Sequence, residues 1–201
     1  MSTSFEVFPT LNTRVKCLDL INESLDKFQN FLERNRIKKY IKVTVQEEGI
    51  KGNLITNPTY ISNDENRYTI LNINDIGEIY IFYHSLTELD TEFWKEEIIR
   101  NHNAKKVEKK IISNKELGYF WSIKRTMAQP AIVSLFYGYI AMTIAKLSAG
   151  IVYSDDGAWD YSSLPMEYCD FESLYLDLDK VNDSLIKKNI QKWICLLKYG
   201  K

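Results

Sequence analysis

The sequence predicts a single α+β domain, in which an antiparallel sheet packs against a central apolar helix and both terminal regions are helical. Residues 131–147 form the longest apolar run, and residues 67–83 are typical of a β-hairpin. Helices and strands mix without the regular βαβ order of a parallel sheet. The 201 residues are enough to bury one core. We therefore expect one domain over residues 1–201, to which a helix at 14–36 either belongs or is appended.

The first half of the chain is expected to contribute one helix and three strands. Apolar residues recur every three or four positions over 14–36, which predicts an amphipathic helix. Residues 40–45 are rich in β-branched side chains and predict a strand, after which a connection with several glycines follows. The runs 67–73 and 78–83 flank a short turn that contains Gly77. This arrangement predicts an antiparallel hairpin.

The second half is expected to begin with a helix over 86–101, whose start Thr87 and Asp90 can cap. Five lysines lie in the segment after it, where residues 109–113 predict a short edge strand whose lysines discourage pairing with another edge. Five more elements follow: a strand at 118–126, a helix at 130–148, a strand at 151–153, and helices at 170–176 and 184–197.

The helix at 130–148 is apolar on nearly all sides and is therefore expected at the centre of the domain. Its first turn tolerates the proline at its start, and Gly150 stands where a glycine would end it. We expect this helix and the hairpin to form one core. The large apolar side chains that would build it are Tyr80, Phe82, Leu135, Tyr139 and Ile140.

Composition favours a cytoplasmic globular protein. A hydrophobic fraction of 45% with 26% charged residues is ordinary for a folded chain and argues against disorder. The widely spaced Cys17, Cys169 and Cys195 predict neither a disulfide framework nor a zinc site. No secretory signal is visible, and the apolar run 131–147 is too short and too polar to cross a bilayer comfortably. We expect no cofactor, no metal and no membrane partner.

The most informative segment is the acidic and aromatic loop that follows the apolar run. Residues 151–180 hold eight carboxylates and one lysine, a local charge of −7, whereas the whole chain carries −1. A concentrated acidic surface with aromatic side chains suits the binding of a basic partner. The candidate partner-binding residues are Tyr153, Asp155, Asp156, Trp159, Asp160 and Tyr161.

Two other interpretations of this loop stay open. Asp155, Asp156 and Asp160 are close enough in sequence to converge on one ion or one reacting atom, which would make the chain a hydrolase with paired aspartates. Against this, the spacing is not that of a calcium loop, no histidine lies near, and a glycine after two aspartates is ordinary turn chemistry. The loop can also be purely structural, with Trp159 folded onto the core.

Other chemistry-bearing residues have no supporting motif. No motif places His84 or His102, the two histidines, beside a cysteine or an activated serine. The glycines form no phosphate-binding motif. We interpret the basic stretch 105–125 as a solvated edge or as a counter-charge to the acidic loop, because the pI is near 6.2 and no RNA-binding signature interleaves the stretch. Nucleic acid is therefore not the expected partner.

Three runs carry a resemblance to a class of proteins: Gly118-Tyr-Phe-Trp-Ser-Ile-Lys-Arg-Thr126, Tyr137-Gly-Tyr-Ile-Ala-Met-Thr-Ile-Ala-Lys146 and Gly150-Ile-Val-Tyr-Ser-Asp-Asp-Gly-Ala-Trp-Asp160. Together they resemble small cytosolic immunity proteins of bacterial polymorphic toxin systems, encoded beside toxins that contact-dependent or type VI secretion delivers. The resemblance covers residues 118–176. It implies a protein without catalytic activity that binds a cognate toxin tightly and blocks its active site or another surface it needs. An acidic aromatic loop would suit a toxin that is basic because it acts on nucleic acid.

Overall fold

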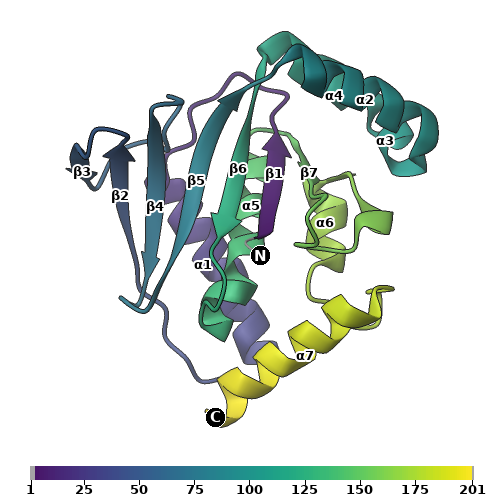
Figure 1. The fold of residues 1–201 in the computed structure, drawn as a ribbon. Coiled ribbons are helices and arrows are strands. Elements are labelled where there is room, and N and C mark those ends of the chain that lie inside the picture. Colours follow the sequence, from purple (N-terminus) through teal and green to yellow (C-terminus); the bar gives the residue numbers. More distant parts are fainter. Residues whose placement is uncertain (1–2, 201) are drawn as a thin grey trace.

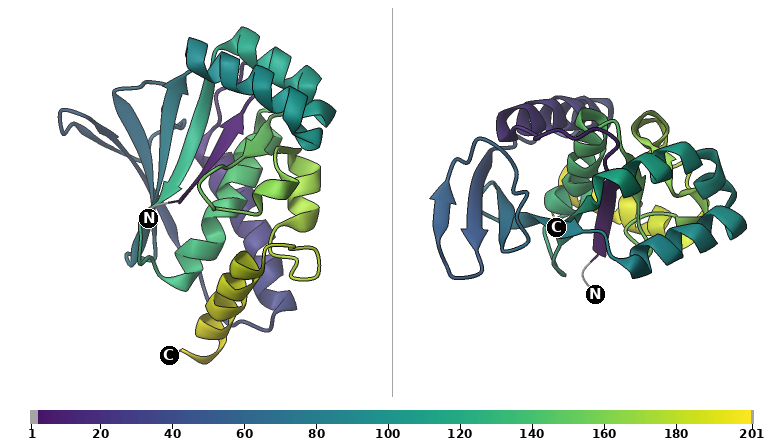
Figure 2. Two further views of the ribbon diagram at one scale, coloured as in Figure 1. Left: turned by 45° about the vertical axis from the view of Figure 1, so that its right-hand side comes forward. Right: turned by 90° about the horizontal axis from the view of Figure 1, so that it is seen from above.

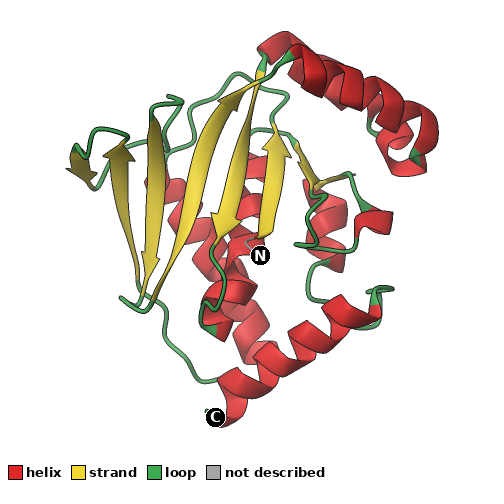
Figure 3. Cartoon of the chain, in the orientation of Figure 1, coloured by secondary structure: helices red, strands yellow, loops and turns green. Residues whose placement is uncertain are grey.

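Eight strands form one antiparallel sheet in the computed structural model, which describes residues 3–200 (Figures 1 and 3). Their order across the sheet is β3-β2-β4-β5-β6-β1-β7-β8. The predicted α+β class and antiparallel sheet are thus confirmed. The strands are β1 (Thr3–Phe8), β2 (Val43–Gly49), β3 (Leu54–Thr56), β4 (Arg67–Ile73), β5 (Gly77–Ser85), β6 (Tyr119–Arg125), β7 (Ile151–Tyr153) and β8 (Met166–Glu167).

Helices cover one face of the sheet and its β7 end. In Figure 1, α1 and α5 lie behind the sheet, α2 to α4 gather beyond the upper ends of the strands, and α7 crosses below. Figure 2 shows the same layers from two further directions. The helices are α1 (Cys17–Arg34), α2 (Glu88–Arg100), α3 (His102–Lys106), α4 (Glu108–Leu117), α5 (Ala131–Leu147), α6 (Tyr168–Leu174) and α7 (Ser184–Tyr199), with a 3₁₀ turn, η1, at Tyr161–Ser163.

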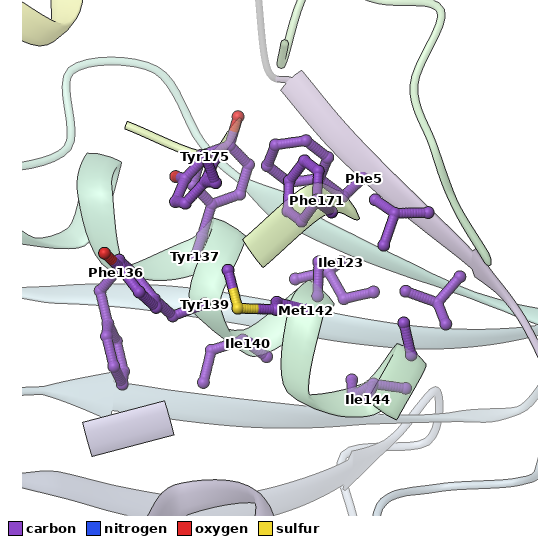
Figure 4. Packing of buried hydrophobic residues seen from close by; sticks show 14 of the residues in the cluster. Phe5, Ile123, Phe136, Tyr137, Tyr139, Ile140, Met142, Ile144, Phe171 and Tyr175 are labelled. Carbon is purple, nitrogen blue, oxygen red and sulfur yellow. The ribbon is translucent and has the colours of Figure 1, made fainter. Parts of the chain in front are cut away.

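The predicted central helix is confirmed as α5. All its residues from 132 to 145 are buried, and it packs against α1, β1 and β6. At one end of α5 the rings of Phe5, Tyr137, Phe171 and Tyr175 come together (Figure 4). The Phe5 ring centroid lies 4.8 Å from that of Tyr137 and 5.3 Å from that of Phe171. Residues far apart in the sequence therefore share one aromatic core.

The prediction of a helical N-terminal region is wrong at its beginning, because the first described element is strand β1. This strand pairs with β6 on one side and with β7 on the other. Phe5 and Val7 alternate with Ser4 and Glu6, so β1 has the two-residue period of a strand. Such a short run gives a weak signal, and its partners come from distant parts of the chain. The predicted helix at 14–36 follows as α1 and packs on α5.

The predicted edge strand at 109–113 is also wrong, because this segment lies in helix α4. Ile111 and Asn114 are buried while Ile112 is half exposed, which is the spacing of one helix face and not the alternation of a strand. Of the two lysines that suggested a guarded strand edge, Lys109 is exposed on this helix and Lys110 is partly buried.

The predicted hairpin is confirmed as β4 and β5, but its contribution to the core is not as expected. Ile79 and Ile81 are fully buried and face α5, whereas Tyr80 and Phe82 lie on the opposite face and are half-buried. Expecting Tyr80 and Phe82 in the central core was therefore wrong. The side chains of the central helix that were expected there, Leu135, Tyr139 and Ile140, are buried as predicted.

Helix α5 ends one residue earlier than the glycine signal predicts. Ala149, with φ of 52°, takes the left-handed position after the helix, and the Gly150 N–H donates to the Ala145 carbonyl at 2.7 Å. Gly150 is required for a different reason, since a Cβ there would lie 2.5 Å from the Phe8 carbonyl oxygen. The glycine allows the chain to pass closely beside β1 as it enters β7.

Candidate partner-binding surface

The two adjacent aspartates of the acidic loop have different environments. Asp156 accepts hydrogen bonds from the Ser4 N–H at 2.7 Å, from the Ser4 hydroxyl at 2.8 Å and from the Ser154 hydroxyl at 3.2 Å. Its carboxylate thereby bonds a backbone N–H of β1 beyond the last residue paired with β7. Asp155 is exposed and makes none of the hydrogen bonds or ion pairs found among residues 3–200. Asp156 therefore fastens the loop to β1, whereas Asp155 is exposed to solvent.

Three of the six candidate residues are buried. The Trp159 side chain packs onto the core, with its ring centroid 4.9 Å from that of Tyr175. Tyr153 lies against Trp94, with 5.2 Å between ring centroids. Asp160 caps the 3₁₀ turn η1 by accepting from the N–H of the second residue of that turn at 3.0 Å. These side chains shape the loop from the inside, so a partner would meet Asp155, Asp156 and Tyr161.

Tyr161 fastens the loop to helix α2 through a buried carboxylate. Its hydroxyl donates to Glu97 at 3.0 Å, and Glu97 also accepts from Arg100 at 2.8 Å and from Asn101 at 3.1 Å. Burial alone would raise the pKa of Glu97, but these three hydrogen bonds outweigh it and lower the pKa. Asn101 in addition donates to the Leu164 carbonyl at 3.0 Å. The exposed part of the loop is therefore held by Asp156 at one end and by Tyr161 and the Leu164 carbonyl at the other.

Glu6 of β1 adds a further carboxylate to this surface. Glu6 pairs with Tyr153 across β1 and β7, so it projects on the sheet face opposite α5, called the front face from here on. Burial and then the negative charges of Asp155 and Asp156 raise the pKa of Glu6 to about 7. Lys124 lowers this pKa and Asp90 raises it. The carboxylate cluster consists of Glu6, Asp90, Asp155 and Asp156.

A row of rings crosses the front face towards this cluster. Over residues 3–200 no helix covers the front face of β2, β4 and β5 (Figure 1). The ring centroids of Tyr68 and Phe82 are 5.2 Å apart, and those of His84 and Phe120 are 5.0 Å apart. All these rings are half-buried. The front-face aromatic row consists of Tyr68, Tyr80, Phe82, His84 and Phe120.

Ring contacts connect this row with the acidic loop. Phe120 stacks on Phe8 at 5.0 Å between centroids, Phe8 meets Trp94 at 5.0 Å, and Trp94 meets Tyr153 at 5.2 Å. Tyr153 in turn lies 6.1 Å from Tyr161. The exposed tyrosine of the loop and the half-buried rings of the sheet thus belong to one continuous aromatic layer, part of which helix α2 covers.

Two polar side chains lie between the row and the carboxylate cluster. Ser122 pairs with Phe82 on one side and with Glu6 on the other, and its buried hydroxyl has no hydrogen-bond partner among the described residues. The Lys124 ammonium lies 5.3 Å from the centroid of the Phe82 ring. Burial and the nearby Lys124 charge lower the pKa of His84, which favours the neutral form of its ring.

The basic stretch 105–125 divides between several roles. Lys110 of α4 forms an ion pair of 3.0 Å with Glu167, which is one of the eight carboxylates of residues 151–180. It also donates to the Ala149 carbonyl at 3.0 Å. This pair agrees with the predicted counter-charge. Among residues 3–200, no group of three or more histidines, cysteines and carboxylates is placed to hold a metal ion. Cys17 is buried, whereas Cys169 and Cys195 are exposed.

Sequence reasoning missed Glu6, Glu97 and most of the aromatic row. The alternation within β5 places isoleucines on one face and aromatic residues on the other, but two apolar faces look alike to a pattern search. Nothing local in the first ten residues signals that Glu6 lies beside an acidic loop from residues 155–156. Tyr161 and Glu97 meet only because α2 packs over the β7 end of the sheet.

Comparisons with protein families, with curated proteins and with solved structures found no match to this chain. Among the described residues, no helix combines the length and the apolar character needed to span a bilayer.

Proposed function

We propose that this protein is an immunity protein that binds a cognate basic protein toxin in the cytoplasm and neutralises it. The binding surface is the front-face aromatic row together with the carboxylate cluster and Tyr161. The sequence predicts only the acidic loop as the binding surface, and this proposal adds the neighbouring face of the sheet. Its support comes from the surface geometry and from the resemblance of residues 118–176 to immunity proteins.

The observation that carries the proposal is the continuity of the two halves of this surface. Large rings such as Phe82 supply apolar area that a partner can cover at little cost in side-chain entropy. Beside them, Asp155 and Asp156 provide negative charge that attracts a basic protein and orients it. Because Asp156 and Tyr161 are bound to β1 and α2, the surface is held in place before the partner arrives, which lowers the entropic cost of binding.

Glu6 adds a dependence on pH to the proposed interaction. A lysine or arginine of the toxin placed near Glu6 would favour its charged form and lower its raised pKa. Binding would then release a proton near pH 7. We expect affinity to increase from pH 6 to pH 8, and Glu6→Gln to remove most of that increase. Asp90, Asp155, Asp156 and Lys124 also face Glu6, and the pH dependence that remains in Glu6→Gln measures their contribution.

The test uses the protein encoded by the adjacent gene as the candidate toxin. Co-expression with this chain should restore growth that the candidate alone abolishes, and surface plasmon resonance should detect a tight complex. Asp155→Lys should slow association severalfold and flatten its salt dependence, because Asp155 supplies charge without supporting the fold. Asp19→Lys on α1 is the matched charge reversal away from the surface, and it should bind like the parent.

Phe82→Ala examines the aromatic half of the surface. It should mainly speed dissociation, by roughly tenfold or more if the ring is an anchor worth about 2 kcal/mol. Tyr40→Ala removes a ring that is 82% exposed outside the surface and serves as its control. A complex that both Asp155→Lys and Phe82→Ala leave intact would place the interface elsewhere. An adjacent gene product that is neither toxic nor bound would contradict the proposed function itself. No contact among the described residues favours the paired-aspartate hydrolase over this proposal.

A further inference from the structure

A small pocket lies on the helix-covered side of the sheet, where the end of β6 meets α5, α7 and the acidic loop. Its volume is about 110 Å³, and it is lined by side chains that include Arg125, Tyr137, Trp159 and Trp193. This volume is several times what one water molecule needs, and well below the roughly 300–1,000 Å³ of sites for drug-sized ligands. The pocket can therefore take a small molecule of a few heavy atoms.

Arg125 is the single charged residue of this lining. Its guanidinium carbon lies 5.1 Å from the Tyr137 ring centroid and 5.2 Å from the Trp193 ring centroid, so two aromatic residues flank it. Its Nε is buried and has no acceptor among the described residues. None of the ion pairs within residues 3–200 involves Arg125. Arg125 is thus a partly buried cation without an ion-pair partner among the described residues.

The rest of the lining is neutral. It consists of aromatic and aliphatic side chains together with the polar groups of Thr3, Ser134 and Asn189, and it contains no carboxylate. Asp156 acts electrostatically on the neighbouring Tyr137, but its oxygens are engaged by Ser4 and Ser154. A partly buried charge without an ionic partner loses part of its hydration, so an anion that enters the pocket would offset that loss.

The shape of the cation and of its surroundings selects among anions. The planar fork of an arginine matches the two oxygens of a carboxylate. Aromatic walls favour an organic acid with an apolar body over a hydrated inorganic ion. From these features we infer that the Arg125 pocket binds a small apolar carboxylate, such as a short-chain monocarboxylic acid. This inference does not rest on the proposed function, because the pocket opens on the other side of the sheet from the aromatic row.

Binding of propionate can be followed directly, because Trp159 and Trp193 line the pocket. Titration at constant ionic strength should give a saturable change in tryptophan fluorescence and a rise in Tm. At ten times the Kd the rise should be about 3–6 °C for a chain of this size. Propionamide has the same shape without the charge and should produce neither effect. Equal responses to propionate and propionamide, or a propionate response that never saturates, would overturn the inference.

Two substitutions assign the effect to the pocket. Arg125→Gln should weaken propionate binding at least tenfold, whereas Lys192→Gln should not change it, although it removes one positive charge from the exposed position beside Trp193. Arg125→Lys keeps the charge but loses the fork, and it should bind with intermediate affinity. If Arg125→Gln does not fold, Arg125→Lys and the propionamide comparison in the parent protein decide the matter. Parental affinity in the folded Arg125 variants would contradict the inference.

Discussion

The two faces of the sheet differ in how far their apolar side chains are buried. Towards α5 the strands present aliphatic residues such as Ile79, Ile81 and Ile123, which are completely buried. On the front face the same strands present Tyr80 and Phe82, which are half-buried. Apolar area that helices cover stabilises the fold, whereas apolar area left partly open is available to a partner. The difference separates the residues that hold this protein together from those proposed to bind.

The largest expected effect comes from placing a charge on the helix side of the sheet. Ile140 is fully buried on α5. Ile140→Asp should abolish the cooperative thermal transition, because an unpaired buried carboxylate costs several kcal/mol, on the order of the whole free energy of unfolding. Circular dichroism melts test this, with Ile140→Leu as the control. A variant as stable as its parent would reject the central position of α5.

Truncating one ring on each face sharpens the comparison. Phe5→Ala removes a fully buried ring from the α5 side and should lower the free energy of unfolding by about 3–5 kcal/mol. Phe82→Ala removes a half-buried ring from the front face and should cost about 1 kcal/mol. Urea denaturation measures both. If the two variants lose the same stability, the front face is part of the structural core and the distinction fails.

The front face also carries a pH-dependent penalty at Glu6. The folded protein raises the pKa of Glu6 from about 4.5 to about 7, so it holds this proton more tightly than the unfolded chain does. Stability should therefore fall as the pH rises from about 4.5 to about 7, by at most about 3 kcal/mol from this group. Glu6→Gln should be more stable than the parent at pH 8 and equal to it at pH 4. Equal stability at both pH values would show that Glu6 is not perturbed.

A smaller effect is expected where the loop is fastened to α2. Tyr161→Phe removes the hydrogen bond to the buried Glu97 carboxylate and should lower the free energy of unfolding by about 1–2 kcal/mol. Tyr199→Phe changes a tyrosine that is 76% exposed and should have no effect. Thermal melts of the two variants, compared side by side, measure the strength of this anchor. Identical melts would mean that Tyr161 does not fasten the loop.

Local patterns predicted most of the elements. The capping box of Thr87 and Asp90 at the start of α2 and the short turn between β4 and β5 both depend on neighbouring residues, and both are found. The position of β1 between β6 and β7 depends on partners far along the chain, so no local pattern contains it. The wrong prediction of a strand within α4 has a different cause: the five residues 109–113 fit the period of a strand as well as that of a helix.

The candidate site shows the same limit. Its charge could be read from composition, and the acidic loop follows α5 as expected. The orientation of single side chains could not be read, because it depends on what each one meets. The Trp159 ring points inward because it packs against Phe171 and Tyr175. The Asp160 carboxylate points towards η1, which it caps. The expectation of Tyr80 and Phe82 in the core is wrong because the sequence does not say which face of the sheet the helices cover.

Oxidative footprinting of the complex tests the central claim most directly. Hydroxyl radicals label exposed rings, and rings at an interface are shielded when the partner binds. With the candidate toxin bound, labelling of Tyr80, Phe82 and Tyr161 should fall severalfold, while Tyr40 and Tyr199 should be labelled as in the free protein. Shielding of Tyr40 or Tyr199 with unchanged labelling of Tyr80 and Phe82 would contradict the account.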